Sequence, residues 1–68
     1  MKYVKENYVG KAIQLYPGDT YSKWGTILDV DDLGWTIKIT RANSERDDYR
    51  VGDVYFFSHS KSFSFKFM

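Results

Sequence analysis

The stretch WTIKIT, residues 35–40, decides the fold class of this chain. Its apolar side chains Trp35, Ile37 and Ile39 alternate with polar ones, and β-branched residues stand on both sides of the alternation. Successive side chains of a strand point to opposite faces, so this pattern predicts a strand with one buried face. β-branched residues favour strands as well.

The last residues repeat the alternation. In SFSFKF, residues 62–67, Phe63, Phe65 and Phe67 fall on one side of an extended chain and polar residues on the other. We expect a final strand whose phenylalanines close the core, because the chain has few other large aliphatic side chains. The alternative is an exposed aromatic ladder that stacks bases or grips a peptide.

Other segments with this period lie upstream. Together they predict five strands, near residues 11–16, 24–31, 35–41, 53–58 and 62–67. The side chains expected in the core are Ile13, Leu15, Leu28, Val30, Ile37, Ile39, Val54, Phe56, Phe63, Phe65 and Phe67. Aromatic residues make up 19% of the chain, and a few large rings are enough to fill a small core.

Turn chemistry separates these segments. Residues 16–19, YPGD, suit a type II turn, in which Gly18 takes the positive φ. Residues 31–34, DDLG, predict a tight hairpin with Gly34 in the left-handed region. Helical signals are weak: a short N-terminal helix around residues 3–8, and a single helical turn near 44–48, which Ser44 and Asp47 would cap.

Five short strands joined by tight turns predict an all-β fold, a small five-stranded antiparallel barrel. Closing the sheet into a barrel would remove the exposed edges of a flat sheet. We expect one domain over residues 1–68, since a chain of this length has room for one small core.

The pattern resembles the SH3-like barrels, including the KOW and Tudor-type modules. The resemblance covers roughly residues 9–67. Its segments are a first strand in GKAIQL (10–15), a long first loop in YPGDTYSKWG (16–25), a central hairpin in GTILDVDDLGWTIKI (25–39) and a late strand entered through RVGDVYFF (50–57). It implies a binding module. The ALYDY-type stretch and paired tryptophans of peptide-binding SH3 domains are absent, so proline-rich peptide binding is not carried over.

Composition narrows the possible classes of protein. There are no cysteines, which excludes disulfides and thiolate metal sites and is compatible with a reducing compartment. No apolar run approaches the ~20 residues of a membrane span, and the N-terminus lacks a signal peptide pattern. We therefore expect a soluble cytoplasmic protein, in the host cytoplasm if the source is viral. A net charge of +1 is too balanced to indicate nucleic acid or membrane by itself.

Catalytic and metal chemistry find little support. Residues 29–34, DVDDLG, begin like a calcium loop, but Leu33 occupies a position that needs an oxygen ligand, and Thr40 stands where a bidentate glutamate is needed. His59 is the only histidine, and we interpret it as a surface loop residue. No glycine-rich phosphate loop is present. We expect no enzyme activity, no catalytic residue, no cofactor and no metal.

The aromatic residues left over from the core indicate a binding site. The first loop, residues 16–24, carries three aromatic residues and one lysine but a single acid. We place the site on this loop and the central hairpin, at Tyr16, Tyr21, Lys23, Trp24 and Trp35. The alternative is that Trp24 and Trp35 plug the two ends of the barrel.

Two functions compete for such a site. The first is a non-enzymatic protein-interaction module, a small inhibitor or adaptor of viral or bacterial origin such as a phage protein. The second is a nucleic-acid-binding barrel with phosphate contacts from Lys11, Lys23, Lys38, Arg41, Lys61 and Lys66. Against the second stand acids that repel phosphate unless they lie far from the site: Asp29, Asp31, Asp32, Glu45, Asp47 and Asp48. A structural subunit of an assembly, such as a virion, is a third alternative. No membrane partner is expected.

Overall fold

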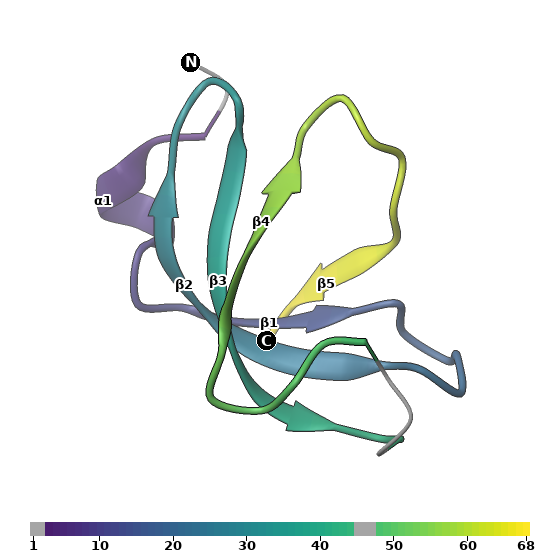
Figure 1. The fold of residues 1–68 in the computed structure, drawn as a ribbon. Coiled ribbons are helices and arrows are strands. Elements are labelled where there is room, and N and C mark those ends of the chain that lie inside the picture. Colours follow the sequence, from purple (N-terminus) through teal and green to yellow (C-terminus); the bar gives the residue numbers. More distant parts are fainter. Residues whose placement is uncertain (1–2, 45–47) are drawn as a thin grey trace.

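A computed structural model of the chain describes residues 3–44 and 48–68. A short helix, α1 (Lys5–Tyr8), precedes five strands (Figure 1). The strands are β1 (Ala12–Leu15), β2 (Lys23–Val30), β3 (Gly34–Ala42), β4 (Val54–Ser58) and β5 (Phe65–Phe67). The predicted mostly-β fold is confirmed, and the N-terminal helix is present.

In the described parts of the chain, no helix has the length and apolar character needed to cross a membrane. The predicted cap partner Asp47 lies outside the described residues.

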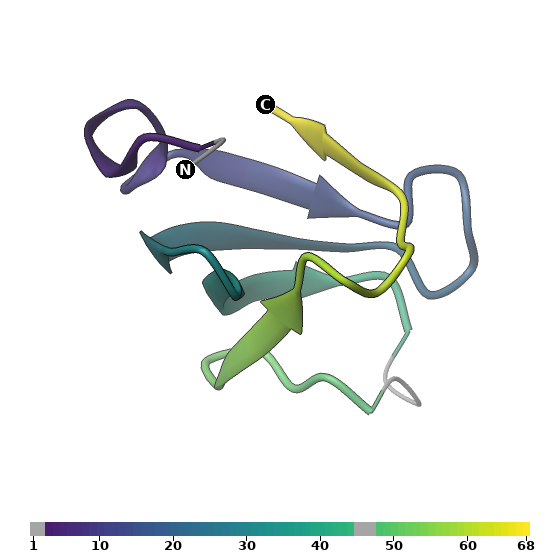
Figure 2. The same cartoon turned by 90° about the horizontal axis from the view of Figure 1, so that it is seen from above.

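All five strands belong to one antiparallel sheet with the order β4-β3-β2-β1-β5. Figure 2 shows this order from above, with β5 along one border of the curved sheet and β4 along the other. Within the described residues the two edge strands do not pair with each other, so the sheet is open and the prediction of a closed barrel is wrong. Aromatic rings span the gap instead, because Phe57 of β4 contacts Phe63, two residues before β5, at a centroid distance of 5.6 Å.

The inner face of the sheet forms the core. Its buried side chains are Ile13, Leu15, Ile27, Val30, Trp35, Ile37, Ile39 and Phe57. The alternation in β3 is therefore read correctly from the sequence, since Trp35, Ile37 and Ile39 are all at most 1% exposed.

Three predicted core residues are exposed instead: Leu28 (43%), Val54 (50%) and Phe56 (53%). In β2, a shift in the pairing register between Ile27 and Asp29 interrupts the alternation. Such a bulge adds one residue, so Leu28 turns outward while both Ile27 and Val30 stay buried. In β4 the other set of alternate residues faces inward, because Phe57 pairs opposite the buried Trp35.

The C-terminal phenylalanines face the core, as predicted. Phe63, Phe65 and Phe67 are half-buried and pack against the buried cluster. Phe65 lies between the other two rings, with centroid distances of 5.3 Å to each. The strand itself is shorter than expected, because Phe63 precedes the first paired residue of β5.

The two turns predicted from the sequence, at residues 16–19 and 31–34, agree with the structure to different degrees. In the first, the Asp19 amide donates to the Tyr16 carbonyl at 3.1 Å and Gly18 has φ +81°, which confirms the predicted turn. The predicted hairpin between β2 and β3 is present, but Gly34 does not have a positive φ, so the left-handed conformation expected for this glycine is wrong. The Asp31 carboxylate shapes this turn instead, because one of its oxygens accepts from the amides of Leu33 (2.8 Å) and Gly34 (3.0 Å).

Candidate binding surface

The side of the sheet that faces away from the core carries a mixed aromatic and basic surface. Strand pairing aligns Lys66, Gln14, Trp24 and Arg41 in one row across β5, β1, β2 and β3. A second row contains Ala12, Thr26, Lys38 and Val54, and a third contains Asp29, Thr36 and Phe56. We call these eleven side chains the outer face.

Trp24 and Arg41 are neighbours at the β3 end of the first row. They are direct cross-strand partners, and the guanidinium carbon of Arg41 lies 4.2 Å from the centroid of the Trp24 ring. Attraction between a cation and an aromatic face favours this stack and holds the arginine in place. The tryptophan is half-buried, so part of its ring remains accessible to a partner.

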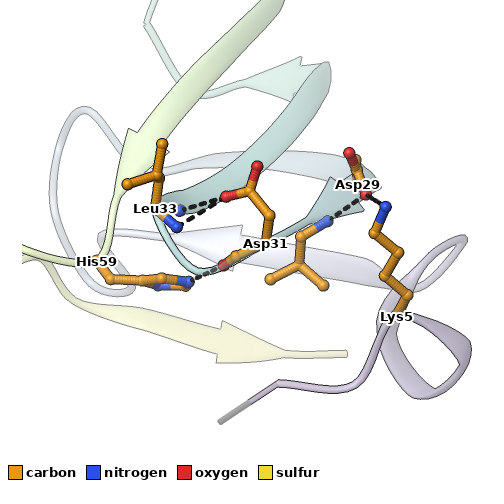
Figure 3. A network of polar contacts seen from close by, with 7 residues as sticks. Lys5, Asp29, Asp31, Leu33 and His59 are labelled. Atoms are coloured by element: carbon orange, nitrogen blue, oxygen red, sulfur yellow. Dashed lines mark hydrogen bonds and ion pairs between the residues drawn. The ribbon is translucent and has the colours of Figure 1, made fainter. Parts of the chain in front are cut away.

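Positive charge predominates on the outer face. Lys38, Arg41 and Lys66 are exposed there. The single acid of the outer face, Asp29, forms an ion pair with Lys5 of α1 at 3.0 Å (Figure 3). Its hydrogen bond with Lys5 holds the pKa of Asp29 below the ordinary value of 3.8, and the same bond raises the pKa of Lys5 above 10.5. The outer face therefore presents net positive charge to a partner.

Two further acids, Asp31 and Asp32, lie in the turn between β2 and β3. There His59 fastens the segment after β4 to the turn, because its Nε2 lies 2.8 Å from the Asp31 carbonyl oxygen (Figure 3). A carbonyl only accepts, so Nε2 carries the proton. The His59 amide also donates to the Leu33 carbonyl at 2.9 Å, and its ring stacks on Tyr3 at 5.3 Å. The histidine expected in a surface loop is thus half-buried and joins three segments.

The structure does not bring the five residues of the predicted site together. Trp35 is 1% exposed and belongs to the inner face, whereas Trp24 lies on the outer face. Lys23 is also 1% exposed; its ammonium donates to the Tyr21 carbonyl at 2.7 Å and lies 4.8 Å from the centroid of the Tyr16 ring. Tyr21 is 47% exposed. The set therefore divides into a buried lysine with a tyrosine beside it, an exposed tyrosine, and two tryptophans on opposite faces.

Burial also removes Lys23 from the proposed phosphate contacts, because an ammonium enclosed by Tyr16, Tyr49 and a carbonyl cannot reach a ligand. Sequence reasoning missed Arg41 as the partner of Trp24. The two register shifts in β2 cancel each other, so counting back from Val30 and Trp35 at the hairpin turn would have found this pair. It also missed Phe56, which was assigned to the core.

Among residues 3–44 and 48–68, no group of three or more histidine, cysteine, aspartate or glutamate side chains is placed to hold a metal ion. Comparisons with protein-family models, with curated proteins and with solved structures find no match to this chain.

Proposed function

We propose that the chain is a non-enzymatic protein-interaction module that binds an acidic surface of its partner through the outer face. The observation that carries the proposal is the Trp24–Arg41 stack, flanked by Lys38 and Lys66. Tryptophan and arginine are enriched among the residues that dominate binding energy in protein interfaces.

Exposed apolar side chains on the same face support a protein partner. Val54 is 50% exposed and Phe56 53% exposed, and both lie on the edge strand β4. Apolar area beside an aromatic and arginine centre matches the composition of protein interfaces, in which such residues lose water on binding. The basic residues around them select a partner of negative charge and speed its approach.

The fold proposal that accompanies this function is a variant SH3-like barrel that stays open. Strands β1 to β4 form a consecutive antiparallel meander, and β5 returns to pair with β1. Among the described residues, β4 and β5 are the only consecutive strands that do not pair with each other. A fold of this kind serves many functions, so it supports a binding module without selecting the partner.

The test is affinity capture from a lysate of the source cell or its host, with and without nuclease. We expect the wild type to capture a protein in both conditions, and Trp24→Ala and the charge reversal Lys38→Glu to lose it. Lys11→Glu is the matched control, because it changes the same charge at a residue before β1, whose ammonium lies over the Tyr8 ring and not on the outer face. Capture that survives both outer-face substitutions in folded protein would contradict the proposal.

A single-stranded nucleic acid is the second candidate partner. It is favoured by the location of charge, since Lys38, Arg41 and Lys66 share a face with Trp24 and Phe56 while Asp31 and Asp32 lie at the hairpin turn. Cations that neutralise phosphates and rings that stack bases are the usual elements of such a site.

Salt dependence separates the two candidates. If three cations contact phosphates of a labelled single-stranded oligonucleotide, the slope of log K against log salt should be about −2. Nuclease should then abolish capture of any protein. Tight protein binding with a shallow salt response, unaffected by nuclease, supports the protein partner instead.

A further inference from the structure

A cavity of about 450 Å³ opens on the inner side of the sheet, where β4 and β5 fail to meet. The N-terminal segment, the turn between β2 and β3, the segment after β4, and β5 itself all line it. This volume falls within the range of roughly 300–1,000 Å³ that is usual for small-molecule sites. The cavity is separate from the outer face, because it lies across the sheet from Trp24.

Aromatic side chains form the apolar part of the cavity. Trp35 lies beneath it at 1% exposure, and the centroids of Tyr3 and Phe65 lie 4.5 Å and 6.1 Å from the Trp35 ring. Phe63 adds a further ring beside Phe65. His59 also lines the cavity, and its hydrogen bond to Asp31 fixes the ring in position. The walls are therefore formed before any ligand enters, which favours a flat aromatic group.

Two opposite charges border the same cavity. Asp32 comes from the hairpin turn, and Lys61 comes from the segment between β4 and β5. Both are exposed, yet they form no ion pair with each other. Among the described residues, neither side chain has a hydrogen-bond or ion-pair partner. One carboxylate and one ammonium thus remain available to a ligand.

We propose that this cavity binds a free aromatic amino acid. The ring packs against Tyr3, Phe63 and Phe65, the α-ammonium pairs with Asp32, and the α-carboxylate pairs with Lys61. A ligand that carries one charge of each sign matches the two charges at the cavity. A nucleotide fits less well, because its phosphate would add negative charge close to Asp32. An aromatic residue inside a peptide lacks both charges.

Three ligands with the same ring test the assignment by titration of ¹⁵N-labelled protein. L-Tryptophan carries both charges, N-acetyl-L-tryptophan lacks the ammonium and L-tryptophanamide lacks the carboxylate. We expect each analogue to bind about tenfold more weakly than tryptophan, because each loses one charge-assisted contact. The amide signals that shift should be those of residues 31–35 and 59–65.

Substitutions assign each charge to its partner. Lys61→Gln should weaken tryptophan binding to the level of tryptophanamide, and Asp32→Asn should weaken it to the level of N-acetyl-tryptophan. Lys66→Gln is the control, since Lys66 lies on the outer face. Ser62→Trp, which places a large ring at an exposed lining residue, should block binding in protein that remains folded.

Several results would overturn the proposal: no shifts up to the solubility limit of tryptophan, equal affinity for the three ligands, or tighter binding of adenosine monophosphate than of tryptophan. Trp24→Ala should leave tryptophan binding unchanged. The result of the tryptophan titration is therefore independent of whether the outer face binds a protein.

Discussion

The two tryptophans show how differently the two faces of one thin sheet use the same residue. Trp35 on the inner face is 1% exposed and touches the rings of Tyr3, Tyr8, Phe65 and Phe67. Trp24 on the outer face is half-buried, and its ring stacks on the guanidinium of Arg41. The first ring holds strands and the N-terminal segment together, whereas the second is the ring that we propose for binding.

The same contrast holds for two lysines. Lys23 points inward and has its ammonium between the rings of Tyr16 and Tyr49, while Lys38 points outward and is exposed. Residue type therefore does not decide which role a side chain takes. The direction imposed by the strand decides it, and this makes the contrast between the faces open to experiment.

The largest effect is expected from the paired substitutions Trp35→Ala and Trp24→Ala. Loss of the buried ring should lower the free energy of unfolding by about 3–5 kcal/mol. That loss would leave a domain of this size largely unfolded. Loss of the outer ring should cost about 1 kcal/mol, because it removes an exposed cation–π contact and partial burial. Urea denaturation measures both, and similar losses would show that the faces do not differ.

Gly34→Ala tests how closely β3 and β4 approach each other beside the outer face. A Cβ at Gly34 would overlap the carbonyl oxygen of Phe57 and lie 2.8 Å from the tip of the Phe56 ring. The backbone cannot move aside cheaply, so we expect a loss of about 3 kcal/mol. Gly18→Ala is the control: it has open space but a φ of +81°, and should cost about 1 kcal/mol. Equal losses in thermal unfolding would argue against the close approach of β3 and β4.

His59→Phe should have a smaller effect. Phenylalanine keeps a flat ring against Tyr3 and Trp35 but cannot donate to the Asp31 carbonyl. We expect a loss of about 1 kcal/mol, the usual net contribution of a hydrogen bond. Hydrogen exchange at Leu33 and Gly34 should rise, because the turn keeps only the backbone hydrogen bond from residue 59 to the Leu33 carbonyl. Unchanged exchange there would contradict that connection.

The smallest effect is expected from Asp29→Asn. The pKa of Asp29 is lowered in the folded state, so its contribution is complete above pH 3.8 and is lost as pH falls through the lowered value. The pKa of Lys5 is raised in the folded state, so the stability that Lys5 contributes is complete below pH 10.5. It is lost as pH rises through the raised value. Thermal midpoints of wild type and variant should therefore differ slightly at pH 7 and converge in strong acid. High salt should also reduce the difference, since both groups are exposed.

The sequence predicted well where the alternation was unbroken. The order and approximate bounds of the strands follow from the periods around Ile13, Ile37 and Phe65. Prediction failed at Leu28, because a bulge changes side-chain direction without any distinctive residue. It failed in VYFF, residues 54–57, because either alternate pair offers apolar side chains to the core, and only pairing with β3 selects Phe57.

The candidate site was harder to predict for a related reason. Its members Trp24, Arg41 and Lys66 come from three strands, and Lys66 joins their row only because β5 pairs with β1, which alternation within a single strand does not reveal. The burial of Lys23 was also hidden, since its enclosing groups come from the first loop and from Tyr49. Closure of the sheet depends on whether the edge strands β4 and β5 pair with each other, and alternation within single strands carries no information about that.

The pairing of β1 with β5 also has a consequence for the order of events in folding. Ile13 lies opposite Phe67, so nearly the whole described chain must be brought together before this pair of strands can form. Contacts so distant in sequence pay loop-closure entropy before they gain stability, whereas the hairpin of β2 and β3 closes locally. We expect that hairpin to form early and β5 to dock last. In stopped-flow kinetics, Phe67→Ala should then accelerate unfolding and leave the folding rate nearly unchanged. Until β5 docks, β1 exposes an unpaired backbone edge, which makes this late step the one at which the chain is most vulnerable to aggregation.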